Sequence, residues 1–213
     1  KMMELNGMQF PLMVEFSSIK SKNTEYICRS CEEIEQILAT EKGNIIVQKF
    51  IEGKTFLIDS VSRNGKHKIV AIWEYKKTMH ESKIIVCHGL FLKSALEMDY
   101  AEQILQFAED VLNSMKILNG PAHMEILITG TGPFLVNIGA HLNEFIGSDL
   151  FALNDSCMGY NQFEAMVDAY LNPGSYELIQ SKPEKMLKVG AVVFLFSFSS
   201  GEVKSIPGID MIR

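Results

Sequence analysis

The pattern of strand-favouring apolar residues around a polar turn predicts an antiparallel hairpin in the first half of the chain. The segments 55–63 and 67–75 are rich in Val, Ile, Phe, Trp and Tyr, which favour strands. They flank Asn64-Gly65, a dipeptide typical of two-residue turns because both residues tolerate a positive φ. We therefore expect a long two-stranded ribbon in this region.

A second hairpin is predicted over 123–141, with 130–132 as its loop. Its alternation predicts these core-facing residues: Met124, Ile126, Ile128, Phe134, Val136, Ile138 and Ala140. In this register Thr129 pairs with Pro133, and Glu125 lies opposite Asn137. The outward face then gathers His123, Glu125, Asn137 and His141. Such a face is either a functional one or the solvated side of a half-covered sheet.

Helical spacing of apolar residues predicts three helices. Each begins with a polar capping pair three residues apart, namely Ser30 and Glu33, Asp99 and Glu102, and Asn161 and Glu164. Further strands are expected over 10–16, 25–28, 44–50 and 84–88, and a third hairpin over 188–198 and 202–206. This mixture of antiparallel strands and single helices predicts an α+β fold rather than a doubly wound parallel sheet.

Composition narrows the class of protein. The chain has 213 residues, 47% hydrophobic and 22% charged, as expected for one or two soluble domains. Its net charge of -6 argues against a general nucleic-acid binder or a protein of anionic membranes. No apolar run approaches the roughly 20 residues of a membrane span. With no secretory signal in view, we expect a cytoplasmic protein.

Cys28 and Cys31 form a C-x-x-C pair, which is found in redox sites and in zinc sites. Zinc requires four ligands, and no second close pair of Cys or His completes such a set. We therefore expect reduced thiols and no metal at this pair.

Two segments resemble the ATP-grasp enzymes, especially the branch of amino-acid and dipeptide ligases. Residues 47–77 resemble that family's hinge, glycine and following hairpin, and 120–145 resemble its metal-binding core, G-P-x-H-x-E followed by G-P-x-L-x-E-x-G-x-R. The resemblance implies an ATP-grasp-like α+β fold. Its parts would be a small lid subdomain (1–50), a larger antiparallel-sheet subdomain with the metal-site hairpin (51–174) and the start of a carboxyl-terminal subdomain (175–213).

The resemblance also implies an activity with ATP and Mg²⁺ as cofactors. ATP would phosphorylate a carboxylate to an acylphosphate, which an amine then attacks, with amino acids as the small-molecule substrates. The residues implied at the adenine hinge and ribose are Val47, Gln48, Lys49, Phe50 and Glu52. The metal ligands would be Glu125 and Asn137, and the catalytic residues would be His141, Lys20 and Lys22.

Several positions depart from the family pattern. Glu15 stands where the lid strand has a lysine on the ATP phosphates, and 17–23 lack the glycines of a phosphate-binding loop. Asn137 replaces the second carboxylate of the metal site, which removes a negative charge. His141 replaces an arginine and lacks its permanent charge and two-pronged hydrogen bonding.

Three hypotheses stay open. The first is an active ATP-dependent carboxylate–amine ligase. The second is a degenerate ATP-grasp domain that binds nucleotide weakly or not at all and acts as a partner or regulatory module. The third is a structural domain inside a larger synthetase. The family's preceding domain is not seen before Lys1, so the chain is either a fragment or a reduced relative, working as a homo-oligomer or with a partner subunit.

Overall fold

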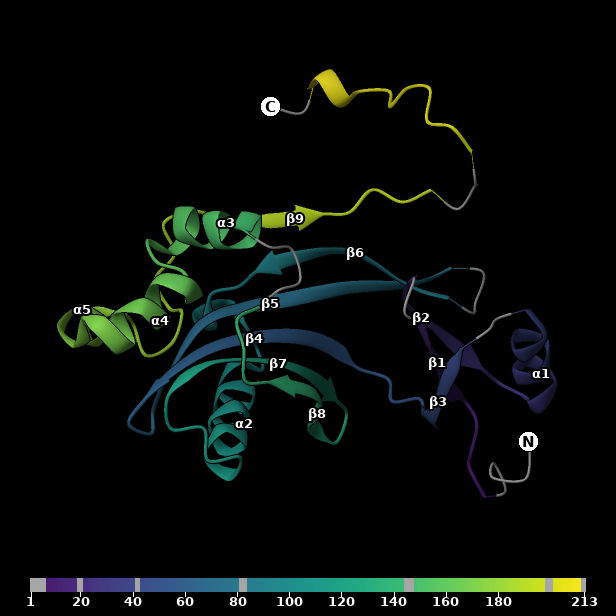
Figure 1. Cartoon of the computed structure of the whole chain (residues 1–213), viewed down its shortest axis with the longest axis horizontal. Coiled ribbons are helices and arrows are strands. Elements are labelled where there is room, and N and C mark those ends of the chain that lie inside the picture. The colour runs from purple at the N-terminus through teal and green to yellow at the C-terminus, as the bar shows by residue number, and fades with distance from the viewer. Residues whose placement is uncertain are drawn as a thin grey trace.

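A single antiparallel sheet runs through the whole computed structural model, which describes residues 7–18, 21–40, 43–80, 84–143, 148–197 and 201–211. The strand order is β3-β1-β2-β6-β5-β4-β7-β8, and β9 also pairs with β6. Figure 1 shows α2 on one side of the sheet and α3 to α5 on the other. The α+β architecture predicted from the alternation of strands and single helices is confirmed.

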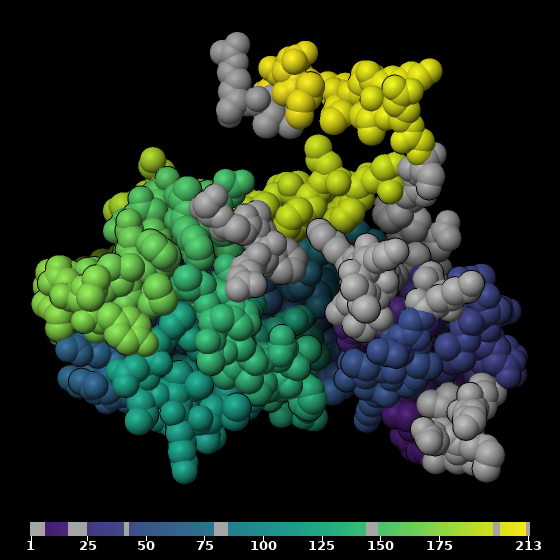
Figure 2. Space-filling model, in the orientation of Figure 1, coloured from purple at the N-terminus to yellow at the C-terminus, as the bar shows by residue number. Residues whose placement is uncertain are grey.

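The first part of the sheet, here called the small unit, contains β1 (Leu12–Ser18), β2 (Ser21–Cys28), α1 (Cys31–Thr40) and β3 (Asn44–Lys49). Buried residues of β1 and α1 form a core of their own. The start of α1 is capped as predicted, because Ser30 Oγ accepts a bond from the Glu33 N–H at 3.3 Å. Figure 2 shows the small unit, in purple and blue, beside the rest of the molecule.

The remainder of the sheet and its helices form the large unit. Its strands are β4 (Lys54–Arg63), β5 (Lys66–His80), β6 (Ile84–Leu92), β7 (Gly120–Thr129), β8 (Gly132–Gly139) and β9 (Ala191–Val193). Its helices are η2 (Ala95–Glu97), α2 (Ala101–Ser114), α3 (Ser148–Met158), α4 (Gln162–Leu171) and α5 (Pro173–Leu178), and η3 (Ile209–Met211) follows near the end.

Strand β4 lies between two hydrophobic cores. Phe56 and Ile58 belong to the core under α2, whereas Leu57 and Val61 belong to the core under α3 to α5. The predicted turn after β4 is confirmed, since Asn64 and Gly65 have φ values of 50° and 74°. The small unit joins this sheet through the pairing of β2 with β6. Within the large unit, β4 pairs along most of its length with β5 on one side and with β7 on the other.

The β7–β8 hairpin agrees with its prediction at one end and differs at the other. Glu125 pairs with Asn137 as expected, but Thr129 pairs with Gly132, so the predicted pairing with Pro133 is wrong. A β-bulge in β8, opposite the Glu125–Ile126 step of β7, accounts for the change of register. Because β8 has one extra residue there, its side chains before the bulge point to the opposite face of the sheet from the predicted one.

The bulge changes which side chains of β8 reach the core. Phe134 and Val136 are 48% and 44% exposed, and Ala140 is also exposed, so their predicted burial is wrong. Leu135 packs against the core under α2 instead, together with Ile138, for which the prediction holds. The β7 residues predicted to be buried, Met124, Ile126 and Ile128, are buried.

Two other predictions are wrong. Asp99 does not cap α2, because the N-cap is Tyr100 and no side chain bonds to the helix end there. The third hairpin is not formed, since β9 is three residues long and pairs with β6, and 202–206 lie in no strand. By contrast, Asn161 caps α4 as predicted, with its Oδ1 accepting the Glu164 N–H at 2.9 Å. No helix among the described residues has the length and apolarity that crossing a membrane requires.

The core under α2 supports a stability prediction. Ile104 is fully buried there, so Ile104→Ala should lower the free energy of unfolding by about 2–5 kcal/mol, because the remaining cavity loses packing contacts. Urea denaturation measures this change. Glu109→Ala, on the exposed side of the same helix, should change it by less than about 0.5 kcal/mol. Equal losses in both variants would contradict the assigned packing of α2.

Candidate functional site

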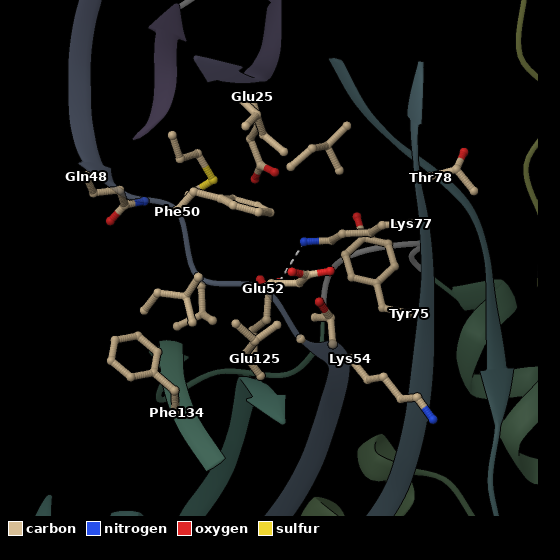
Figure 3. Close-up of a pocket in the computed structure, with 18 of the residues that line it drawn as sticks. Glu25, Gln48, Phe50, Glu52, Lys54, Tyr75, Lys77, Thr78, Glu125 and Phe134 are labelled. Atoms are coloured by element: carbon tan, nitrogen blue, oxygen red, sulfur yellow. Dashed lines mark hydrogen bonds and ion pairs between the residues drawn. The ribbon is translucent and has the colours of Figure 1, made fainter. Parts of the chain in front are cut away.

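A cavity of about 540 Å³ lies where the small unit faces the large unit (Figure 3). Its walls come from β1 and β2, from the segment that links β3 to β4, and from β5, β7 and β8. Phe134 and Val136, which the bulge turns away from the core, contribute an apolar wall together with Leu127. The cavity therefore combines apolar surface with charged side chains, as is usual for small-molecule sites.

The end of β3 and the linking segment bring most of the predicted hinge residues to the cavity. Gln48, Lys49, Phe50 and Glu52 line it, whereas Val47 packs against the core of the small unit. Gly53 ends this segment where the backbone passes close to β7. An added Cβ at that glycine would lie 2.4 Å from the Ile128 carbonyl oxygen, so only glycine permits this approach.

An ion pair lies at the centre of the cavity. Lys77 Nζ on β5 donates to Glu125 Oε1 on β7 at 2.9 Å, with both side chains about a quarter exposed, at 24% and 22%. The same ammonium lies 4.5 Å from the centre of the Tyr75 ring, a cation–π distance. Glu125, the metal ligand implied by the family resemblance, is thus already paired with a positive charge from this chain.

Glu25 on β2 adds a second carboxylate to the cavity. Burial raises the pKa of the Glu25 carboxyl, and the nearby charges of Glu125 and Glu15 add to this rise, while Lys77 opposes it. Glu15 lies directly opposite Glu25 in the β1–β2 pair. Glu15, at the position where the family resemblance implies a lysine, therefore adds negative charge next to this wall rather than neutralising it.

A second ion cluster lies at the cavity wall formed by β5. Glu74 accepts from Lys76, and Lys93 Nζ lies 3.1 Å from its other oxygen. Burial alone would raise the pKa of Glu74, but the bonds from these two ammonium groups outweigh burial and lower it. This carboxylate is held by its own cations and is less available to a ligand than Glu25.

The other predicted site residues occupy different places. Asn137 pairs with Glu125 across the hairpin but is exposed and does not line the cavity. His141 lies beyond the end of β8, exposed, with its ring centre 6.5 Å from that of His123. Lys20 and the side chain of Lys22 lie outside the described residues.

The sequence interpretation missed Glu25. Lys77 lines the cavity rather than lying at a solvated strand end. Trp73 is fully buried in the core, whereas Tyr75 lines the cavity. Alternation along β5 assigns Tyr75 and Lys77 to one face, which was the available signal. The four cysteines are free thiols, as expected.

The chain offers oxygen donors for a divalent metal at one position. The Glu125 carboxylate and the Asn137 amide come from directly paired residues, and oxygen ligands of this kind suit Mg²⁺. In the described part of the chain, this position included, no cluster of three or more His, Cys, Asp or Glu residues is placed to hold a metal.

Comparison with known proteins finds a matching family model and similar proteins. The family model described as the ATP-grasp domain matches residues 16–145. Dapdiamide A synthase of Enterobacter agglomerans is 24% identical over 214 residues, which cover 94% of this chain and 49% of that protein. The chain thus spans about half the length of this relative.

Solved structures give the same fold. The crystal structure of an L-amino acid ligase from Bacillus licheniformis matches with a TM-score of 0.73 at 17% identity, covering 96% of this chain and 50% of that one. An ADP complex of N5-carboxyaminoimidazole ribonucleotide synthetase matches with a TM-score of 0.63 at 14% identity, covering 89% and 47%.

The buried carboxylate of Glu25 leads to a pH prediction. Because the folded state raises the pKa of Glu25 above 4.5, the protonated form is favoured on folding, and this contribution to stability is lost as the pH rises through the folded pKa. Glu25→Gln should therefore raise the free energy of unfolding at pH 7. The gain should vanish below the unfolded pKa, near 4.5.

Denaturation at pH 7 and pH 4 measures this difference, with the exposed Glu109→Gln as the control. An equal gain at both pH values, or the same gain in the control, would show that the burial of Glu25 does not penalise its charge.

Proposed function

This chain belongs to the ATP-grasp family, and on that premise we propose that it is the nucleotide-binding part of an ATP-dependent carboxylate–amine ligase. The observation that carries the proposal is a cavity that both sets of predicted residues share. It is lined by the predicted hinge residues Gln48, Lys49 and Phe50, from the end of β3 and the linking segment, and by Glu125 of β7. The similarity to dapdiamide A synthase and to an L-amino acid ligase supports amino acids as the substrate class.

In this proposal adenine lies against Phe50 and the apolar wall formed by Phe134 and Val136, and Glu52 or Gln48 bonds the ribose. The triphosphate then extends toward Glu125. A bound Mg²⁺ would supply charge neutralisation for the phosphates, with Glu125 and Asn137 as its ligands from this chain. Val47 supports the segment from the core of the small unit.

The reaction has two steps. A substrate carboxylate oxygen attacks the γ-phosphorus of ATP, and the bond to the β-phosphate oxygen breaks, which releases ADP and leaves an acylphosphate. The nitrogen of an amine then attacks the acyl carbon. The carbon–oxygen bond to the phosphate breaks, phosphate leaves with the electron pair, and the nitrogen loses one proton as the amide forms.

Lys77 takes the part of the missing lid lysine in this proposal. Its ammonium is already in the cavity, 2.9 Å from Glu125, whereas Glu15 supplies the wrong charge for phosphate. Phosphate oxygens would attract the ammonium away from Glu125, and this carboxylate would then be free for the metal. Lys20 and Lys22 stay candidates for additional phosphate contacts, and His141 stays the candidate for the substrate position of the family's arginine.

A second candidate function is a nucleotide-binding or regulatory module without catalysis, acting through a partner subunit or as a homo-oligomer. The Lys77–Glu125 ion pair and the amide at Asn137 favour it, because both lower the negative charge available to Mg²⁺. Nucleotide binding and turnover distinguish the two candidates. A cytoplasmic location is part of the proposal in either case.

Calorimetric titration of ATP, with and without Mg²⁺, tests the charges of the cavity. Glu15→Lys combined with Asn137→Glu should lower the dissociation constant for ATP in Mg²⁺ by about tenfold, because it restores a phosphate cation and a metal carboxylate. Glu109→Gln makes the same net change of charge outside the residues that line the cavity and should leave this constant unchanged. Equal tightening in the control, or the same tightening of the double variant with and without Mg²⁺, would contradict the assigned metal position.

Release of ADP tests the ligase itself. The protein should release ADP only when both an amino-acid carboxylate and an amine are present, and Glu125→Gln should lower turnover by about 100-fold or more, since it removes the metal carboxylate. Hydroxylamine can replace the amine and reports acylphosphate formation as a hydroxamate. Nucleotide binding without ADP release over a broad panel of acids would favour the second candidate.

A further inference from the structure

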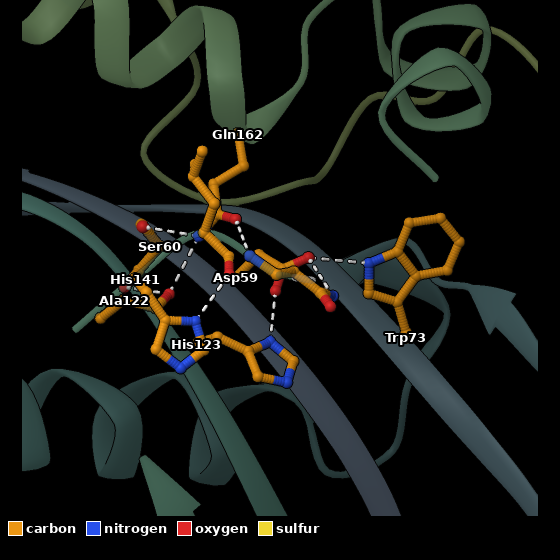
Figure 4. A network of polar contacts seen from close by, with 9 residues as sticks. Asp59, Ser60, Trp73, Ala122, His123, His141 and Gln162 are labelled. Atoms are coloured by element: carbon orange, nitrogen blue, oxygen red, sulfur yellow. Dashed lines mark hydrogen bonds and ion pairs between the residues drawn. The ribbon is translucent and has the colours of Figure 1, made fainter. Parts of the chain in front are cut away.

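Strand β4 carries a buried carboxylate that lies outside the set of residues assigned so far. Asp59 on β4 is 3% exposed, yet its two oxygens accept bonds from three N–H donors (Figure 4). His123 Nδ1 lies 2.7 Å from Oδ1, and Oδ2 receives Trp73 Nε1 at 3.0 Å and Asn143 Nδ2 at 3.2 Å. A buried carboxylate is costly unless it is fully bonded, and this one is.

Asn143 and Gln162 connect the hydrogen bonds of Asp59 to backbone groups around it. The Asn143 N–H donates to Gln162 Oε1 at 2.8 Å. Gln162 Nε2 in turn donates to the carbonyl oxygens of Ser60 at 3.1 Å and Ala122 at 3.0 Å. The segment that follows β8 is thereby tied to β4, β7 and the start of α4. This rigid surround holds Asp59 in one position relative to His123.

Asp59 determines which nitrogen of His123 carries the hydrogen. A carboxylate can only accept here, so Nδ1 donates, and the neutral ring keeps its lone pair on Nε2. The His123 side chain is 15% exposed, and Figure 4 shows Nε2 on the side of the ring away from Asp59. Among the residues that the structure describes, none bonds to this nitrogen. The ring therefore presents a hydrogen-bond acceptor of fixed direction.

His141 flanks this acceptor. Its Nδ1 donates to the Leu142 carbonyl at 2.7 Å, and its ring lies over Gly139, the residue paired with His123. An added Cβ at Gly139 would lie 2.0 Å from His141 Nε2, so the glycine provides the space that this ring occupies. Figure 4 shows the two imidazoles side by side.

The position of His123 along β7 assigns it to the far end of the site. Ile128 pairs with Lys54 beside the hinge segment, Glu125 comes three residues earlier, and His123 two residues earlier again. At about 3.3 Å per residue, His123 is about 7 Å further from the hinge than Glu125. Nucleotide phosphates that reach Glu125 therefore point toward His123, where the acyl carbon of the proposed intermediate would lie.

We propose that Asp59 is a positioning residue that fixes His123 with its lone pair on Nε2, and that this nitrogen accepts a hydrogen bond from the attacking amine. The inference rests on the proposed ligase function and deepens it. One N–H of the amine bonds to His123, and the nitrogen lone pair stays free to attack the acyl carbon. The ligand class is a neutral amine with at least one N–H bond, as in the amino group of an amino acid.

Asp59→Asn is the principal test. The amide has nearly the same shape and its oxygen can still accept from Trp73 and Asn143, but its N–H₂ turns toward His123 Nδ1 and forces the hydrogen onto Nε2. The acceptor becomes a donor. Nitrogen-15 NMR of the imidazoles should show His123 with the hydrogen on Nδ1 in the wild type and on Nε2 in the variant.

Activity measurements on the complete protein separate positioning from damage. Asp59→Asn should lower kcat/KM for the amine by about tenfold or more, the effect of losing one oriented hydrogen bond. ADP release with hydroxylamine should stay within about twofold of the wild type, because this small nucleophile attacks the acylphosphate without being oriented.

Two variants serve as controls. His67→Gln removes an imidazole whose Nδ1 is bonded to Ser62 Oγ at 2.7 Å, at the other end of β5, and should leave both activities unchanged. Trp73→Phe removes another donor to Asp59 and should lower stability without moving the His123 hydrogen to Nε2.

The outcomes are distinct. An unchanged His123 tautomer in Asp59→Asn, or an equal loss with amine and hydroxylamine, would overturn this inference while leaving the ligase intact. A wild-type protein that releases no ADP with any acid and hydroxylamine would contradict the proposed function itself, and the amine role with it.

Discussion

The burial of β4 on both faces is the constraint on which the rest of the structure depends. Its side chains alternate between two cores, so a slip of one residue would place each set of side chains in the wrong core. The register of β4 with β7 is therefore strongly specified, and it places Leu57 beside Glu125 and Asp59 beside His123. The pairing along this one strand therefore sets the relative positions of the polar groups in the cavity and in the buried network.

Two carboxylates on these strands have opposite environments, and the difference explains their proposed roles. Glu125 is partly exposed and paired with the flexible side chain of Lys77, a partner that a ligand can displace. Asp59 is buried and accepts from three N–H donors of this chain, two of which, His123 and Trp73, lie on strands of the sheet. The first suits a changing contact with metal and phosphate, and the second suits a fixed support for an imidazole.

The departures from the family pattern have a partial structural compensation. Glu15 lies opposite Glu25 and adds negative charge to the lid side, but Lys77 brings a cation into the same cavity from β5. The family resemblance alone directed attention to the lid strand and to 17–23, and it assigned no role to a lysine about 60 residues later. Asn137 keeps its place opposite Glu125 although its side chain is exposed.

Local patterns of the sequence determined the strands of the large ribbon, the Asn64-Gly65 turn, the caps of α1 and α4, and the pairing of Glu125 with Asn137, because each depends on neighbours within one turn or hairpin. Only the tertiary structure decided the bulge that turns Phe134 toward the cavity. It also decided the meeting of Lys77 with Glu125 and of Asp59 with His123, which are 48 and 64 residues apart. Periodicity predicts on which face of a strand a side chain lies. The residue opposite it depends on strand order and register, which the packing of both cores determines.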